Sequence, residues 1–201
     1  MEETSLKLTF HPLTPERWLA FSRFFGEQGA CGGCWCMWWK LKRSDFLKQK
    51  GEENRKALGK LVDSGEVPGI LAYVGAEPVG WCAVAPREAY PALARSRVLK
   101  CVDGKPVWSI VCFYVAKQFR RKGLTSALLE AALEHAEKHG GTLMEGYPVE
   151  PKTAKLPDVF AYTGLRPRFA RRASQRSQGA PKRAQSCATQ LSGSETECQS
   201  L

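Results

Sequence analysis

The sequence contains no long hydrophobic run. Its longest strongly apolar stretch, Val107 to Ala116, is far shorter than the ~20 residues that a membrane-crossing helix needs. The opening MEETSLKLTF lacks a basic region followed by an apolar core, so a secretory signal is not expected. We therefore predict a cytoplasmic protein without a membrane partner, in which the eight cysteines are reduced thiols.

Two common nucleotide-binding signatures are also absent. The chain has neither G-x-x-x-x-G-K-[ST] nor G-x-G-x-x-G with a later acidic residue, which argues against P-loop and Rossmann sites. The net charge is +10, but from residue 166 onward seven Lys or Arg face two Glu, so half of the excess lies there. No aromatic-and-basic binding motif accompanies the charge, and nucleic acid is not expected as a partner.

Strand and helix patterns alternate along the first 165 residues, which predicts a single α/β domain. Strands are expected at 5–10, at 69–75 and 79–86 as a hairpin, at 107–116 buried on both faces, and at 142–148. Helices are expected at 14–25, within 44–64 as one or two, and at 121–138, with a helical turn or loop at 87–97.

The start of the helix at 121–138 has an unusual charge. Arg120, Arg121 and Lys122 stand where helices favour acidic residues, because the free N–H groups of the first turn carry partial positive charge. Gly123 lets the backbone approach another group closely, so the N–H groups and the helix dipole could form an anion site suited to a pyrophosphate. A basic helix start that faces solvent explains the same residues, and the glycine alone does not decide.

The context of this turn resembles the GNAT N-acetyltransferase superfamily. Its signature, [QR]-x-x-G-x-[GA], is matched by RRKGLT at 120–125 after the strand segment CFYVAKQF, with Thr125 in place of Gly or Ala. The order CWCMWW, NR, GWCAVAPR, CFYV and EGYP is similar to a bacterial subgroup, over about residues 6–165. The resemblance implies the GNAT fold, a mixed, mostly antiparallel central sheet flanked by helices.

The resemblance also implies an activity: transfer of an acetyl group from acetyl-CoA to a primary amine of a small molecule or peptide, by direct attack. It assigns acetyl-CoA binding to Phe113, Tyr114 and Val115 for the pantetheine arm, and to Arg120, Arg121, Lys122, Gly123, Leu124 and Thr125 for the pyrophosphate. The proposed base is Glu145, and the candidate acids are Tyr147 and Tyr162. A solvated or salt-bridged carboxylate explains Glu145 equally well. A monomer or homodimer is expected, and the alternative function is a non-catalytic CoA-binding or inactive remnant.

The segment CGGCWCMWW has several explanations. We predict that it forms a wall of the acceptor pocket, because tryptophan rings can face a cation. The residues assigned to this wall are Cys34, Trp35, Cys36, Trp38 and Trp39. A core aromatic cluster with thiols filling gaps explains them as well. A zinc-dependent module with Cys31, Cys34, Cys36 and His11 as ligands is a third reading, but no second Cys or Cys-His pair follows at zinc-finger spacing, and no metal is predicted.

The last part of the chain does not continue the family pattern. We predict a GNAT domain at 1–169 and a basic, disordered tail at 170–201, rich in Ser, Gln, Ala and Arg. Read one nucleotide out of register, Phe169 to Ala188 can encode RQAGFTEVARRSxxRPIMR, which supplies the expected Gly-Phe and two strands. We therefore predict a frameshift between about Gly164 and Arg168, with the last strands missing or altered and a sheet edge left exposed.

Overall fold

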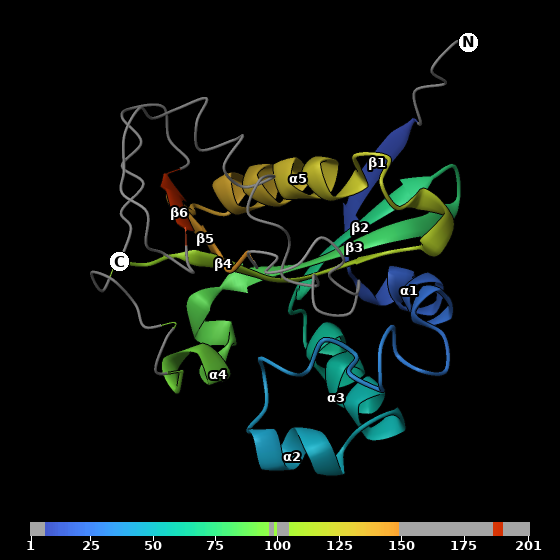
Figure 1. The fold of residues 1–201 in the computed structure, drawn as a ribbon, viewed down its shortest axis with the longest axis vertical. Coiled ribbons are helices and arrows are strands. Elements are labelled where there is room, and N and C mark those ends of the chain that lie inside the picture. Colours follow the sequence, from blue (N-terminus) through green and yellow to red (C-terminus); the bar gives the residue numbers. More distant parts are fainter. Residues whose placement is uncertain (1–6, 97–98, 100–104, 149–186, 191–201) are drawn as a thin grey trace, which may run out of the picture.

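A central sheet separates two layers of helices in the computed structural model (Figure 1). The structure describes residues 7–96, 99, 105–148 and 187–190. The strands lie side by side in sequence order: β1 (Leu8–Pro12), β2 (Gly69–Val74), β3 (Glu77–Pro86), β4 (Trp108–Val115), β5 (Leu143–Gly146) and β6 (Cys187–Gln190). All neighbouring strands are antiparallel except β4 and β5, which are parallel. The mixed, mostly antiparallel sheet is therefore confirmed.

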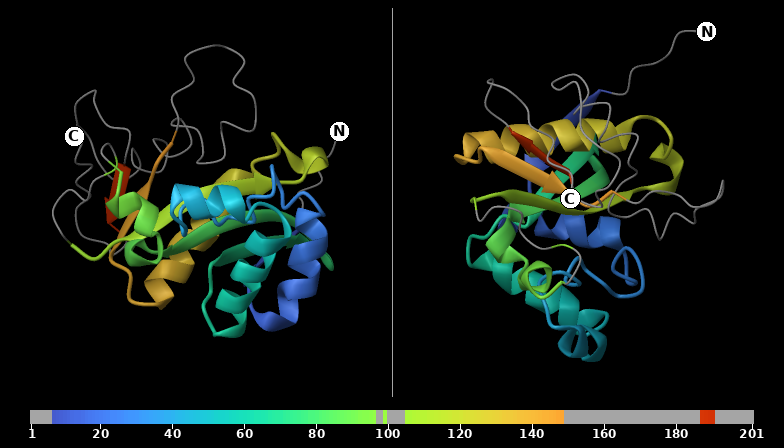
Figure 2. Two further views of the ribbon diagram at one scale, coloured as in Figure 1. Left: turned by 90° about the horizontal axis from the view of Figure 1, so that it is seen from below. Right: turned by 60° about the vertical axis from the view of Figure 1, so that its left-hand side comes forward.

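The helices cover both faces of the sheet (Figures 1 and 2). On one face α5 (Leu124–Lys138) buries Leu124, Leu128 and Ala132 against the sheet. On the other face lie α1 (Trp18–Phe25), α2 (Arg43–Lys48), α3 (Glu52–Asp63) and α4 (Pro91–Ala94). Short 3-10 turns at Pro15–Arg17, Arg87–Ala89 and Lys117–Phe119 complete the described elements. Each face thus carries its own apolar core, as expected of a sheet covered by helices on both sides.

Glycine and positive φ angles set the helix bounds that the sequence left open. The segment 44–64 forms two helices, because Gly51 adopts a φ of 83° between them. The helix expected from residue 121 begins at Leu124, since Arg121 and Gly123 have φ angles of 63° and 78°. A left-handed backbone cannot continue a right-handed helix, so these residues form the turn in front of it.

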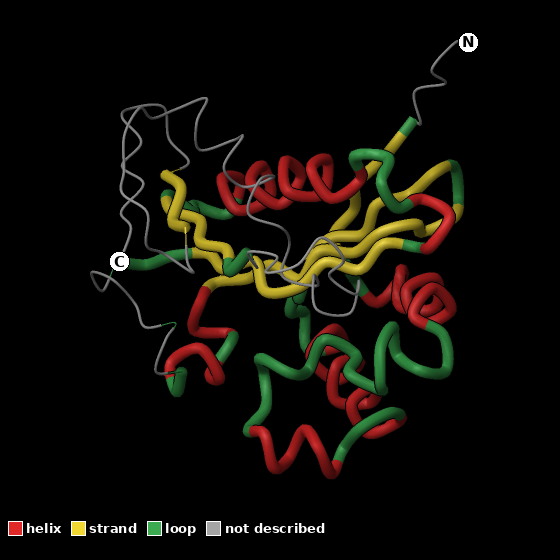
Figure 3. Tube along the Cα trace, viewed as in Figure 1, coloured by secondary structure: helices red, strands yellow, loops and turns green. Residues whose placement is uncertain are grey.

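The parallel pair of β4 and β5 is short (Figure 3). Three pairs hold it together, Trp108 with Met144, Ser109 with Glu145 and Ile110 with Gly146, and then β5 ends. β4 continues to Val115 along β3, with a register shift between Ala83 and Val84 that leaves Val111 without a partner in β3. From Val111 onward, the outer edge of β4 faces no other strand among the described residues.

A short piece of the predicted tail at 170–201 belongs to the sheet. Four residues of the range 170–201, Cys187–Gln190, form β6 and pair antiparallel with β5, so the outer edge of β5 is not left exposed. Pairing of this kind uses main-chain N–H and C=O groups, so an edge strand can accept a segment whose side chains show no strand pattern. The remaining residues of the predicted tail, and the predicted frameshift at 164–168, lie outside the described residues.

Candidate active site

The turn between β4 and α5 exposes unused backbone donors. Arg120 closes the turn, because its Nε donates to the Val115 carbonyl at 3.0 Å. The amides of Ser126 and Ala127 donate to the Gly123 carbonyl at 2.9 and 3.2 Å. Within the described part of the chain, the amides of residues 121–125 donate to no acceptor. Free N–H groups at the first turn of a long helix form a site for an anion.

Charge and open space surround these donors. The side chains of Arg121 and Lys122 are exposed, and the Lys122 ammonium lies 5.7 Å from the centre of the Phe119 ring. A Cβ atom placed on Gly123 would meet no other atom within 4 Å, so the space in front of the glycine is open. Thr125 follows in the first helical turn and is half-buried. The turn therefore has the donors, the charge and the room that a phosphate group requires.

The three residues assigned to the pantetheine arm lie on the open part of β4. Phe113 is buried beneath α5, whereas Tyr114 packs on the opposite face against Phe24 and Phe25, with ring centres 5.1 and 5.4 Å apart. Their side chains therefore belong to the two cores, and the strand edge offers its main chain. The Val115 carbonyl is already used by Arg120.

A buried polar cluster lies where β4 and β5 separate. Ser109 Oγ donates to Glu145 Oε1 at 2.5 Å, and Arg87 Nη1 and the Tyr147 hydroxyl bind the same oxygen. Arg87 Nη1 also lies 2.7 Å from the Tyr147 hydroxyl, and its Nη2 donates to the Leu99 carbonyl. Glu145 as a residue is 5% exposed. Glu145 is thus held in a salt bridge with Arg87, which was one of the alternatives that the sequence left open for this carboxylate.

The contacts of Glu145 are all made by one of its oxygens. Oε1 accepts the three hydrogen bonds and forms the ion pair, whereas no described residue binds Oε2. Burial, followed by the charge of Glu145, raises the pKa of Tyr147 far above its usual value, so this group stays a phenol at neutral pH. The cluster therefore presents a fixed carboxylate with one oxygen available.

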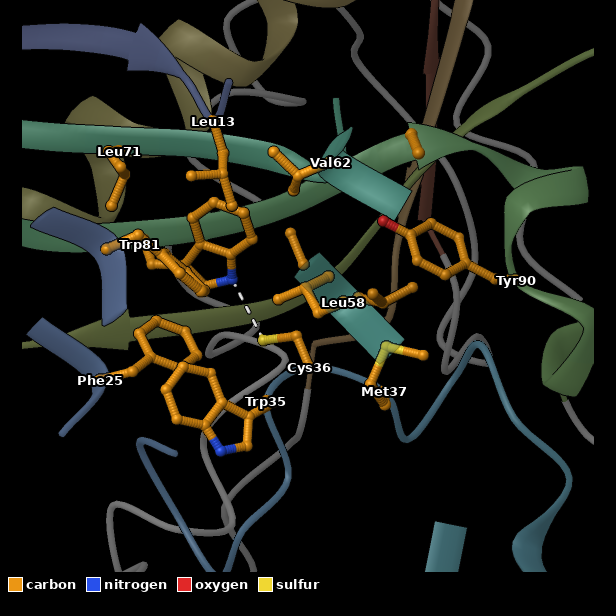
Figure 4. Close-up of a cluster of buried hydrophobic side chains, with 14 of the residues drawn as sticks. Leu13, Phe25, Trp35, Cys36, Met37, Leu58, Val62, Leu71, Trp81 and Tyr90 are labelled. Carbon is orange, nitrogen blue, oxygen red and sulfur yellow. Dashed lines mark hydrogen bonds between the residues drawn. The ribbon is translucent and has the colours of Figure 1, made fainter. Parts of the chain in front are cut away.

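The aromatic segment is divided between the core and this cluster. Trp35 is 2% exposed and packs on Trp18, Phe21 and Phe25, with ring centres 6.4, 6.1 and 5.6 Å away (Figure 4). Trp38 is half-buried against Phe46. Trp39 stacks on Tyr147 at 6.3 Å, and its buried Nε1 has no partner in the described part of the chain. Trp39 is thus joined to the polar cluster, whereas Trp35 is a core residue.

Residues 35–149 match the model of the acetyltransferase (GNAT) family. The chain belongs to this family. The match includes the aromatic segment from Trp35 onward, the edge of β4 beyond its pairs with β5, the anion-binding turn and Glu145. No curated protein matches the sequence of this GNAT chain.

Several solved acetyltransferases are similar to this GNAT chain in fold. The diaminobutyrate acetyltransferase EctA of Paenibacillus lautus is 14% identical with a TM-score of 0.47, over 85% of this chain and 77% of its own. The aminoglycoside acetyltransferase meta-AAC0020 from a soil metagenome is 14% identical with a TM-score of 0.45, over 90% and 96%. A GCN5-related N-acetyltransferase of Kribbella flavida is 14% identical with a TM-score of 0.42, over 75% of this chain, which spans 32% of that protein.

Cys34 and Cys36 of the aromatic segment are packed as thiols. Cys36 is buried and its Sγ accepts a hydrogen bond from Trp81 Nε1 at 3.1 Å (Figure 4). The hydrogen bond with Cys36, together with burial, raises the pKa of the Cys34 thiol far above its usual value. Zinc requires thiolates, and no group of three or more metal-binding side chains occurs among the described residues. Cys34 and Cys36 thus fill space beside the aromatic rings.

Two members of the polar cluster were not identified from the sequence. Arg87 begins the 3-10 turn directly after β3 and Ser109 lies on β4, 58 and 36 residues before Glu145. The one available signal for Arg87 is its place directly after the strand GWCAVAP, where a basic residue follows an apolar run. Tyr162 lies outside the described residues. Among the helices that the structure describes, none is long and apolar enough to cross a membrane.

Proposed function

We propose that this chain transfers an acetyl group from acetyl-CoA to a primary amine of a small molecule or peptide, in the cytoplasm. One observation carries the proposal. Beyond its pairs with β5, the outer edge of β4 has no strand partner among the described residues, and it leads directly into the amides at the start of α5, which donate to no described acceptor. An extended arm and a phosphate group that belong to one molecule can therefore be bound along a single continuous path.

Acetyl-CoA fits this path by its chemistry. The amides of residues 121–125 donate to the pyrophosphate, while Arg121 and Lys122 supply positive charge. The main chain of β4 at 113–115 binds the pantetheine arm in the manner of an added strand. Arg120 contributes mainly by holding the turn to Val115, and Gly123 leaves room for the phosphate.

The reaction is direct aminolysis of the thioester. The amine nitrogen attacks the acetyl carbon, the new C–N bond forms, and the C–S bond breaks to release CoA as a thiolate. Glu145 takes the proton of the attacking amine, directly or through one water, because its Oε2 is free while Oε1 is held in place. The Tyr147 hydroxyl donates a hydrogen bond to Glu145 Oε1, so Tyr147 serves better to hold that carboxylate than to protonate the thiolate.

The acceptor amine approaches from the face of the sheet that carries Trp39 and Tyr147. These stacked rings, with the half-buried Trp38 in the same segment, provide π faces that attract a cationic amine. The unpaired Nε1 of Trp39 offers one hydrogen bond to an oxygen of the acceptor. The acceptor wall therefore consists of Trp38 and Trp39, without Trp35.

The test is turnover of acetyl-CoA by the full chain with a panel of amines, read as acetylated product by mass spectrometry. A thiol-trapping dye is unsuitable because Cys31 is an exposed thiol. The panel includes L-2,4-diaminobutyric acid and sisomicin, the ligands named for two of the similar structures. Product formation supports the proposal. Binding of CoA without any product would instead support the non-catalytic CoA-binding role.

A further inference from the structure

Arg87 connects three parts of the fold through one guanidinium group. Its Nη1 contacts both Glu145 and Tyr147 at the end of β5, and its Nη2 binds the Leu99 carbonyl. The backbone of Arg87 is held as well, since its amide donates to the Val107 carbonyl at 2.9 Å just before β4. The planar fork of arginine suits such a junction, because its donors have fixed directions.

The electrostatics of the cluster depend on this one cation. The ionisable groups that contact Glu145 among the described residues are Arg87 and Tyr147, and Tyr90 lies near Tyr147. The phenols carry no charge at neutral pH, because burial raises the pKa of both Tyr147 and Tyr90. Without the guanidinium, no described residue would place an opposite charge beside the buried carboxylate, which would then bind a proton more readily.

We propose that Arg87 is a positioning residue for acetyl transfer: it places the opposite charge beside the buried Glu145 carboxylate and holds that carboxylate so that Oε1 is anchored and Oε2 is left to accept the proton. The inference rests on the proposed function for its chemistry, but the pairing of Arg87 with Glu145 does not. The position of the cluster supports it. Ser109 and Glu145 form the middle one of the three pairs that precede the opening of the sheet, so a shift there moves the carboxylate relative to the open edge of β4.

The first experiment needs no turnover. The unfolding free energy of the full chain is measured between about pH 5.5 and about pH 8 for the wild type, Arg87→Met and the double variant Arg87→Met with Glu145→Gln. We expect Arg87→Met to lose stability increasingly as the pH rises, because a buried carboxylate without its cation is disfavoured in the charged form. Glu145→Gln should remove most of that pH dependence. A loss that is independent of pH and not relieved by Glu145→Gln would overturn the proposal.

A second variant separates the charge of Arg87 from its geometry, and a control variant measures the effect of losing a surface arginine. Arg87→Lys retains the charge but loses the fork, so its stability loss should be smaller and nearly independent of pH. Arg95→Met is the matched control, because the exposed Arg95 also donates to a main-chain carbonyl, that of Leu41, at 3.1 Å. Arg95→Met should change the free energy of unfolding only by the small amount usual for a surface substitution. If Arg95→Met lost as much stability as Arg87→Met, that would count against a special role for Arg87.

The second experiment uses the amine found in the turnover screen. We expect Arg87→Lys to lower kcat tenfold or more at neutral pH, because the fork that orients Glu145 is lost, and to leave the acid limb of the pH–rate profile in place, because the charge is kept. Arg87→Met, which removes the charge, should move the acid limb to higher pH, and both variants should leave the KM for acetyl-CoA within about twofold. An unchanged kcat in Arg87→Lys, or an unmoved acid limb in Arg87→Met, would overturn the positioning role. If the wild type turns over no amine, the proposed function fails, while the unfolding experiment still decides whether the charge of Arg87 stabilises the buried Glu145 carboxylate.

Discussion

Ser109 on β4 and Glu145 on β5 face each other in register, and Ser109 Oγ donates to Glu145 Oε1 at 2.5 Å. Two residues further along β4, the parallel pairing has ended and no other strand of the described residues pairs with this edge. The carboxylate is thus fixed at the point where the sheet separates. A proton acceptor held there stands next to the path that we assign to acetyl-CoA.

The first prediction concerns the anion-binding turn. Gly123→Val should abolish CoA binding, because the added side chain fills the open space before the helix and a β-branched residue is strained at a φ of 78°. Calorimetry with CoA measures the loss. Gly140→Val is a matched control at the other end of α5, where φ is 79° and a Cβ also meets no atom within 4 Å. Normal CoA affinity in Gly123→Val would refute the assignment of the turn.

The second prediction separates the charge of Arg121 from its backbone strain. Arg121→Ala and Arg121→Gly should weaken CoA binding to a similar, modest extent that shrinks at high salt, because both remove one exposed cation. The free energy of unfolding of Arg121→Gly should be about 1 kcal/mol higher than that of Arg121→Ala, since glycine tolerates the φ of 63°. Equal stability of the two variants would show that the turn relaxes in solution.

The third prediction concerns the proton acceptor. Glu145→Gln should lower turnover about 10²-fold or more with little change in CoA affinity, because the amide keeps the shape of the side chain but cannot take a proton. Tyr147→Phe is the comparison, since it removes one donor to Oε1 and leaves the carboxylate with Arg87 and Ser109. Its turnover should fall less. If the pH–rate profile of Glu145→Gln equals that of the wild type, Glu145 is not the base.

The fourth prediction distinguishes the two tryptophans. Trp35→Ala should destabilise the protein by about 3–5 kcal/mol, because the ring is 2% exposed among other core rings. Trp39→Ala should raise the KM for the amine roughly tenfold, in keeping with a cation–π contribution of ~1–2 kcal/mol. Thermal unfolding and amine saturation curves give the two readouts. A core-like stability loss in Trp39→Ala with an unchanged KM would remove Trp39 from the acceptor wall.

The fifth prediction is a pH dependence far from the proposed site. Burial, together with the charges of His139 and Lys138, lowers the pKa of His135 to about 4, and its ring packs edge-on against Trp108 at 5.6 Å. The folded state therefore favours the neutral imidazole, so its stabilising effect is present above about pH 6.5 and is lost as the pH falls toward 4. Because the ring is half-exposed, we expect roughly 1 kcal/mol. NMR titration of the His135 ring should give a midpoint near 4, and a midpoint near 6.5 would contradict the packing.

The sequence by itself determined those features of the protein that depend on residues close together in the chain. The order of strands and helices, the buried strand at 107–116 and the glycine turn before α5 follow from hydrophobic period, helix caps and glycine, and all three are present in the structure. The family also follows, because its signature lies in one continuous turn.

Only the tertiary structure decided which distant residues meet. Arg87, Ser109 and Glu145 come together because the ends of β3, β4 and β5 lie side by side, and no local pattern encodes a contact over 58 residues. Trp35 and Trp39 look alike in the sequence, yet one enters the core and the other reaches Tyr147. The different placement of the two rings depends on the left-handed backbone of Trp35 and Cys36, whose φ angles are 44° and 55°. Packing against Trp81 and the surrounding rings offsets the strain of this backbone.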